Sequence, residues 1–99
     1  MTIRERDIEA KCKQYARRKG DYVRKFVSMS NRSVPDDLLI TAGWVWFAEF
    51  KAFGKKLTPL QADEHKAIRD AGGIVFTFYN VDDFKTVRDA IASQETDNG

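Results

Sequence analysis

Residues 34–51, VPDDLLITAGWVWFAEFK, decide the fold, because they hold two apolar runs of strand length on either side of a short turn. Residues 36–41 and 44–51 are rich in aliphatic, β-branched and aromatic side chains, which is typical of strands. Ala42-Gly43 between them is a weak turn signal, since Asn-Gly would suit a two-residue loop better. The stretch predicts an antiparallel hairpin.

The length of the loop also predicts the register of this hairpin. Thr41 pairs with Trp44 and, counting outward, Asp36 meets Glu49 at the open end. Successive side chains point to opposite faces of a strand, so Asp36, Glu49 and Lys51 share one face. The other face of the hairpin is apolar, and the face with the acids is apolar near the turn. We therefore expect both faces to be covered.

Two carboxylates in these positions create an electrostatic conflict. Directly opposed Cβ atoms lie about 4.5–5.5 Å apart, so two ionised acids repel and one tends to take up a proton. A divalent cation removes the repulsion, and Mg²⁺ takes carboxylates together with waters and phosphate oxygens. Lys51 could hold a scissile phosphate or an activated water, which suits phosphodiester hydrolysis. The alternative is a surface hairpin with ordinary acids and Lys51 in a salt bridge.

The flanking sequence predicts two more strands and three helices. Helices are expected over residues 2–19, 58–71 and roughly 82–93, and strands over residues 22–28 and 74–79. The connection from the second hairpin strand through helix 58–71 to strand 74–79 is a crossover, which should be parallel and right-handed. The order α-β-β-β-α-β-α predicts an α/β fold, a mixed β-sheet flanked by helices.

Capping residues and apolar spacing support the helices. Thr2 with Glu5, and Thr58 with Gln61, have the spacing of a capping box. Cys12 lies in the apolar stripe of the first helix and is expected to be an inert core residue. The buried face of helix 58–71 is expected at Leu60, Ala67, Ile68 and Ala71, with His65 as a partly exposed bystander.

Length and composition indicate a single small domain. The 99 residues fit one domain over residues 1–93, with residues 94–99 as a frayed tail. No apolar run is long enough to cross a membrane, and the charged N-terminus is not a secretory signal. The single cysteine excludes an intramolecular disulfide and a cysteine-rich zinc site. We expect a cytoplasmic protein with no membrane partner and no organic cofactor.

The charges are distributed unevenly along the chain. Residues 1–56 hold 13 Lys and Arg against 7 Asp and Glu, whereas residues 57–99 hold 4 against 8. A basic half is typical of proteins that bind polyanions, although ordinary solvated surfaces would also explain it. The candidate DNA contacts are Arg17, Arg18, Lys19, Lys25, Arg32, Lys55 and Lys56.

The spacing PD-x12-E-x-K, formed by Pro35-Asp36, Glu49 and Lys51, resembles the PD-(D/E)XK nuclease superfamily with its restriction-endonuclease-like core. The chain is most similar to the VRR-NUC group, the virus-type replication-repair nucleases. The resemblance covers nearly the whole chain: ERDIEAK in the first helix, KFVS at 25–28, VPD at 34–36 and FAEFKAFGKKLTPLQ at 47–61.

The resemblance implies roles for individual residues. Asp36 and Glu49 would be metal ligands, with the backbone carbonyl of Phe50 as a third, and Lys51 would be the catalytic lysine. The accessory acid and further metal ligand on the first helix would be Glu9, with Glu5 as its rival. Gln61 would orient the catalytic lysine or a phosphate.

Three positions depart from the family pattern: Ser33 replaces a frequent Gly, Met29 a common Pro, and Asp37 a frequent Arg. An acid in place of an arginine at position 37 argues against phosphate binding at that position, near the site. The residues that correspond to the metal ligands are intact.

The resemblance implies a structure-specific DNA endonuclease that uses Mg²⁺ or Mn²⁺ and resolves Holliday (four-way) junctions as a homodimer. If the chain is encoded by a phage or prophage, it would act in the cytoplasm of the bacterial host. The alternatives are a nuclease for flaps, nicks or restriction-type sites, a DNA-binding module with an inactive site, and a subunit of a larger assembly whose acids only make ion pairs.

Overall fold

The computed structural model describes residues 3–95 and contains the seven elements in the expected order. The helices are α1 (Glu5–Arg18), α2 (Pro59–Asp70) and α3 (Val81–Ala92). The strands are β1 (Tyr22–Lys25), β2 (Asp37–Thr41), β3 (Trp44–Phe50) and β4 (Val75–Phe78). The expected tail at 94–99 falls mostly outside the described residues.

The hairpin register is the one that the sequence predicts. Thr41 lies opposite Trp44, and the antiparallel ladder continues to Asp37 opposite Ala48. The turn has positive φ at both central residues, 50° at Ala42 and 87° at Gly43, as a type I′ turn requires. Ala42 therefore adopts the left-handed backbone conformation, which lets the turn match the twist of the two strands.

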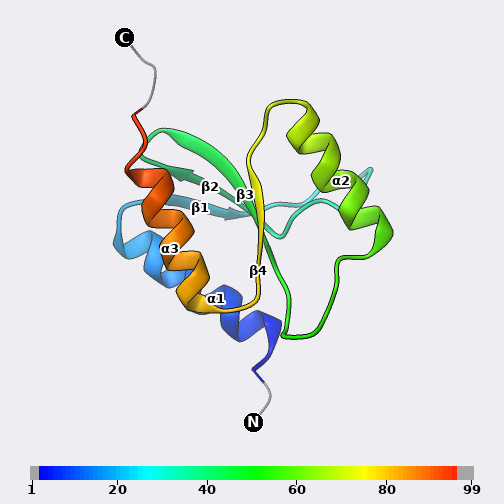
Figure 1. Cartoon of the computed structure of the whole chain (residues 1–99), viewed down its shortest axis with the longest axis horizontal. Helices are drawn as coiled ribbons and strands as arrows, with labels where there is room; N and C mark the ends of the chain where they lie inside the picture. The colour runs from blue at the N-terminus through cyan, green and yellow to red at the C-terminus, as the bar shows by residue number, and fades with distance from the viewer. Residues whose placement is uncertain (1–2, 96–99) are drawn as a thin grey trace.

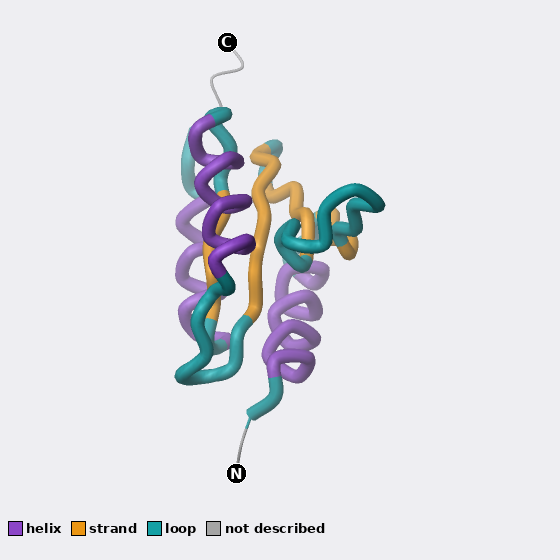
Figure 2. The backbone as a smooth tube through the Cα atoms, turned by 90° about the vertical axis from the view of Figure 1, so that its right-hand side faces the viewer, coloured by secondary structure: helices purple, strands orange, loops and turns teal. Residues whose placement is uncertain are grey.

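The four strands form one mixed sheet in the order β1-β2-β3-β4. β1 is antiparallel to β2, whereas β4 is parallel to β3, as the crossover through α2 predicts. Figure 1 shows α1 and α3 side by side at one side of the sheet and α2 at the other. Seen from the side, the strands lie between the helices (Figure 2). The mixed-sheet α/β fold is confirmed.

An aromatic cluster fills the space between the sheet and the helices α1 and α3. The ring of Phe84 packs 5.7 Å from Trp46, 6.0 Å from Phe50 and 5.1 Å from Phe78, measured between centroids. Ile8, Cys12 and Ala16 of α1 complete this core. The predicted burial of Cys12 is confirmed, and that burial raises the pKa of its thiol to about 12.

A buried polar network ties α3 to the sheet. Arg88 donates to both carboxylate oxygens of Asp21 over 2.7 and 2.9 Å. Asp21 also accepts from the hydroxyl of Thr41, which in turn accepts from the indole N–H of Trp46. Because all four side chains find partners, this network can lie in the core without unpaired polar groups.

Three expectations about element boundaries and faces were wrong. α1 begins at Glu5, with Arg4 at the N-cap and no side-chain capping bond, and the expected cap, Thr2, lies outside the described residues. β1 ends at Lys25 and not at residue 28. After one further bond, from Phe26 N–H to the carbonyl of Asp36, the chain leaves the sheet as a loop. The expected buried face of α2 is also displaced: Leu60, Ala67 and Ala71 are exposed, while His65 is buried.

The capping box of α2 is present as predicted. The hydroxyl of Thr58 accepts from the N–H of Gln61, and the side chain of Gln61 accepts from the N–H of Thr58. Within residues 3–95, no helix combines the length and apolar character needed to cross a membrane.

Candidate active site

Asp36 and Glu49 come together at the open end of the hairpin. Asp36 lies just before β2, and its Oδ2 accepts a hydrogen bond of 2.8 Å from the N–H of Phe50. The bond from Phe26 N–H to the Asp36 carbonyl, 2.9 Å, fixes the backbone on the other side. The sheet therefore holds the Asp36 carboxylate in one orientation, against the backbone of Phe50, which directly follows Glu49.

Glu49 is an almost fully enclosed acid, with 2% of its surface exposed. Burial, reinforced by the charge of Asp36 and contact with its carboxylate, raises the pKa of Glu49 to about 8. The positive charge of Lys51 opposes this shift, and the negative charge of Glu5 adds to it. The electrostatic conflict that the hairpin register predicts is thus a property of the folded chain.

Lys51 continues β3 beyond Glu49. Its backbone N–H donates to the carbonyl of Phe78 over 2.9 Å, which fastens the ends of β3 and β4 together. In the part of the chain that the structure describes, its ammonium forms no ion pair. The salt bridge of the alternative interpretation is thus not formed among residues 3–95, where the charge of Lys51 is available to an anion.

His65 of α2 contacts Glu49. Its Nε2 lies 3.4 Å from Oε1 of Glu49, and only 1% of its surface is exposed. Burial, followed by the positive charge of Arg69, lowers the pKa of His65. The expectation of a partly exposed bystander was wrong, because α2 turns His65 toward the polar surface that Glu49 presents, and not the apolar residues of the predicted stripe.

Glu5 and Glu9 lie in different surroundings, although both belong to α1. Oε1 of Glu5 accepts from the N–H of Ala52, 3.3 Å away, directly after Lys51. Glu9 instead pairs with Lys25 at 3.1 Å and Lys13 at 3.8 Å. Burial alone would raise the pKa of Glu9, but hydrogen bonding with Asp37 and Lys25 lowers it overall. The structure therefore brings Glu5, the rival, to the end of β3.

Asp37 does not add its charge to the Asp36–Glu49 face. As the next residue along the strand, it points toward α1, where Oδ1 lies 3.3 Å from the ammonium of Lys13. It is fully buried, and burial together with the neighbouring Glu9 raises the pKa of Asp37 to about 7. Asp37, which stands where the family often has an arginine, thus lies on the face of the sheet that α1 covers, opposite to the face that His65 contacts.

Gln61 is engaged in the capping box described above. Within residues 3–95 it makes no hydrogen bond to Lys51, and its role in orienting the catalytic lysine or a phosphate stays a prediction.

The donor set suits a partly hydrated hard cation. Within residues 3–95, no three histidine, cysteine or acidic side chains converge into a metal cluster. Mg²⁺ does not need one, because it commonly keeps several waters and takes one or two carboxylates plus substrate oxygens. Asp36, Glu49 and the carbonyl of Phe50 match that requirement, and the raised pKa of Glu49 is the property that a cation would relieve.

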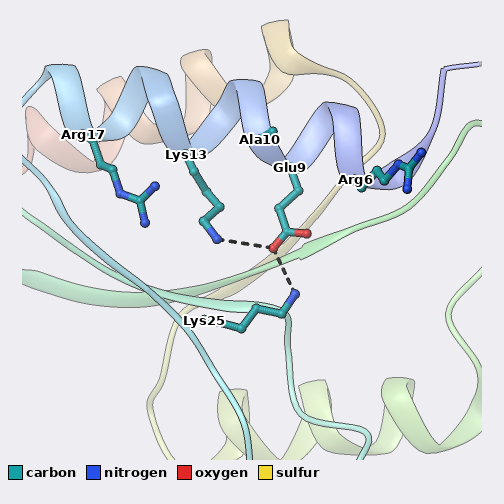
Figure 3. A pocket seen from close by; sticks show the side chains of 6 residues that line it. All are labelled: Arg6, Glu9, Ala10, Lys13, Arg17 and Lys25. Atoms are coloured by element: carbon teal, nitrogen blue, oxygen red, sulfur yellow. Dashed lines mark hydrogen bonds and ion pairs between the residues drawn. The ribbon is translucent and has the colours of Figure 1, made fainter.

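Basic side chains surround a hollow between α1 and the edge strand β1, with a volume of about 330 Å³. Figure 3 shows Lys13 and Arg17 extending from α1 into the hollow, with the carboxylate of Glu9 between the ammonium groups of Lys13 and Lys25, whereas Arg6 lies near the start of the helix and points away from Lys25. The sequence predicted Arg17 and Lys25 and missed Arg6 and Lys13. The available signal was the spacing along α1: Arg6, Lys13 and Arg17 follow one another after 7 and 4 residues, which places all three on one helix face.

The other predicted DNA contacts lie apart from that hollow. Arg32 lines a second hollow of about 280 Å³, which reaches Asp36 and shares only Lys25 with the first. Lys55 and Lys56 line a third, on the loop after β3. Arg18 and Lys19 are exposed at the end of α1 and line none of these three hollows.

Comparison with known proteins finds similar chains among curated sequences and among solved structures. A protein named "Putative nuclease p44", from Acyrthosiphon pisum secondary endosymbiont phage 1, is 44% identical over 64 residues, which are 64% of this chain and 69% of that protein. A solved structure named "VRR_NUC domain" superposes with a TM-score of 0.78 and 28% identity, covering 86% of this chain and 94% of that one. No protein-family model matches the chain.

Proposed function

The chain belongs to the VRR-NUC family of nucleases, and on that premise we propose that it is a divalent-metal-dependent DNA endonuclease whose active site is formed by Asp36, Glu49 and Lys51. The observation that carries the proposal is the enclosed Glu49 beside Asp36, at the point where Lys51 leaves β3 without an ion-pair partner among the described residues. A cation would offset the repulsion between the two acids, and a phosphate would pair with the ammonium of Lys51.

In this proposal the protein positions each reacting group. Asp36, Glu49 and the carbonyl of Phe50 would hold Mg²⁺ or Mn²⁺, which when bound lowers the pKa of a water and offsets charge on the phosphate. The N–H of Phe50 keeps the Asp36 carboxylate oriented. Lys51 is close to the same acids, so its ammonium can bind the scissile phosphate and stabilise charge that develops on it.

We assign the role of accessory acid to Glu5 rather than Glu9. Support comes from the bond between Glu5 and the N–H of Ala52, and from the effect of its charge on Glu49. Glu9 is neutralised by Lys13 and Lys25. In this assignment Glu9 orders the two lysines that face the DNA backbone.

The preferred substrate in this proposal is a four-way DNA junction, cut by a homodimer in the cytoplasm of a bacterial host. A domain with one site needs a second copy to make two symmetric cuts, and a two-fold pair supplies it. The hollow lined by Arg6, Lys13, Arg17 and Lys25 offers a path for the phosphate backbone. Affinity for DNA should therefore fall steeply as the salt concentration rises.

The test is a cleavage assay on four-way junctions, flaps, nicked duplex and linear duplex, each with Mg²⁺, Mn²⁺ or EDTA. We expect paired symmetric nicks in the junction with either metal and none with EDTA. A protein that retards the junction in a gel but never nicks it would be a DNA-binding module, and the nuclease proposal would fail. Equal rates on junction and linear duplex would refute the junction preference, and a monomeric mass in complex with DNA would refute the homodimer.

A further inference from the structure

We propose that a hollow at the carboxyl ends of β3 and β4 binds an unpaired nucleobase of the DNA strand being cut, with the ring of Phe53 stacked on that base. The inference rests on the proposed nuclease function and names a substrate contact next to its active site. The hollow has a volume of about 390 Å³ and is lined by Phe53, Gly54, Lys55, Lys56, Tyr79 and Asn80.

The backbone presents Phe53 at the corner of a closed turn. The N–H of Lys55 donates to the carbonyl of Ala52 over 3.0 Å, and Gly54 has a φ of 85°. A positive φ at the third position of such a turn favours glycine and leaves the second position, here Phe53, at the corner. The ring is 95% exposed. The turn thus holds a large apolar ring in water rather than in the core.

The opposite wall of the hollow is also fixed. Tyr79 directly follows Phe78 of β4, and Asn80 caps α3 by accepting from the N–H of Asp83 over 2.8 Å. The bond from Lys51 N–H to the carbonyl of Phe78 holds both walls to the same end of the sheet. A ring entering between Phe53 and Tyr79 would therefore meet two walls whose backbone is already held in place.

The hollow lies beside the proposed active site. Phe53 follows Lys51 by two residues, so their Cα atoms lie within about 7 Å of each other. A phosphate held by Lys51 would place the base of an adjoining nucleotide within reach of Phe53, because one nucleotide spans a similar distance. The hollow is thus suited to a nucleotide that flanks the cut.

The chemistry of the lining favours a nucleotide over an apolar peptide. Two aromatic rings offer flat apolar surface to a base, and the exposed Lys55 and Lys56 offer positive charge to the phosphates of its nucleotide. Stacking on a ring tolerates any base, since every base has a flat face. A base can reach the hollow only if it leaves its duplex, and that costs least where pairing is already interrupted. Phe53 would therefore favour branched over continuous DNA.

The first test is photochemical and needs no cleavage. 5-Iodouracil is placed next to the branch point of a four-way junction, the complex is irradiated in EDTA, and the cross-linked peptide is identified by mass spectrometry. We expect the cross-link on the peptide that contains Phe53. It should be retained in Phe53→Trp, which keeps a flat ring, and lost in Phe53→Leu. A cross-link located on another part of the chain would overturn the proposal.

A matched control is Tyr22→Leu, which also replaces an exposed ring by leucine. Tyr22 is 48% exposed and lies opposite Ile40, near the turn end of the sheet and away from Lys51. This variant should keep both the cross-link and the affinity for the junction. Loss of the cross-link in Tyr22→Leu as well would show a general effect of surface aromatics and would overturn the assignment to Phe53.

The second test measures binding. Phe53→Leu should weaken binding of the junction about tenfold and leave the affinity for linear duplex unchanged. Equal affinities of variant and wild type for the junction, or a change of oligomeric mass in Phe53→Leu, would overturn the base site. If the wild type cross-links through Phe53 but cuts no DNA in Mn²⁺, the nuclease proposal fails and the base site stands.

Discussion

Nε2 of His65 lies 3.4 Å from Oε1 of Glu49, and the two side chains shield each other from solvent between α2 and the sheet. Residues that contact a metal-binding carboxylate fix its orientation, and their loss typically lowers metal affinity or activity by 10- to about 100-fold. His65 is thus a positioning residue for Glu49 in the proposed site.

Replacing His65 by alanine should lower the cleavage rate by at least about tenfold and raise the Mn²⁺ concentration needed for half-maximal activity. His65→Gln keeps a polar group that can donate to or accept from Glu49 at a similar distance, and should recover much of both. A titration of activity against Mn²⁺ measures the two effects. If alanine and glutamine behave alike while both variants remain folded, the contact has no positioning role.

The raised pKa of Glu49 predicts how stability depends on pH. The folded state holds this proton up to about pH 8, whereas an unfolded glutamate releases it near 4.5. The stability from the protonated form is therefore complete below about pH 4.5 and is lost as the pH rises through about 8. In EDTA, the melting temperature of the wild type should fall between pH 6 and 9 relative to that of Glu49→Gln.

A divalent cation should reverse that loss. At pH 8.5, Mn²⁺ in millimolar excess should raise the melting temperature of the wild type by mass action and leave that of Glu49→Gln unchanged. Differential scanning fluorimetry gives both curves. An equal response in wild type and variant would place the cation elsewhere.

Asp36→Asn and Lys51→Ala should each lower cleavage by about 10²–10³-fold or more. The amide in Asp36→Asn keeps an oxygen that can accept from the N–H of Phe50, so the fold should persist while the charge on the site is reduced. Circular dichroism and junction binding in EDTA should resemble those of the wild type. Asp63→Asn, an exposed acid on α2, is the matched control, and full turnover in either site variant would contradict the proposed active site.

Glu5→Gln and Glu9→Gln should separate the two candidates for the accessory acid. Glu5 is next to the backbone that follows Lys51, so its amide variant should lose activity at saturating DNA. Glu9 balances Lys13 and Lys25, so its amide variant should retain the cleavage rate and bind DNA more tightly at low salt. The opposite pattern in single-turnover rates would return the role to Glu9.

Arg88→Met should destabilise the fold without a direct effect on cleavage. Arg88 is enclosed with Asp21, and removing one partner of a buried ion pair costs about 3–5 kcal/mol. The exposed pair of Lys66 and Asp70 provides a control, because Lys66→Met should cost less than about 1 kcal/mol. Urea denaturation measures both. Equal midpoints for the two variants would show that the Arg88 network contributes little.

Much of the fold could be predicted from local sequence because its cause is local. The side-chain period of two and a two-residue loop allow few registers for the hairpin, and the observed one places Thr41 opposite Trp44. The same register brings Asp36 and Glu49 together. The Thr58–Gln61 capping box marks the start of α2 for the same reason, since it depends on residues three positions apart.

What the sequence by itself determined is the order of elements, the hairpin register and the meeting of Asp36, Glu49 and Lys51 at one end of β3. The tertiary structure decided which neighbours those residues have. The rotation of α2 that buries His65, and the crossing of α1 that brings Glu5 rather than Glu9 to the end of β3, depend on how each helix packs on the sheet. Spacing along a strand fixes pairing over a few ångströms, whereas helix placement depends on the summed packing of residues distant in sequence.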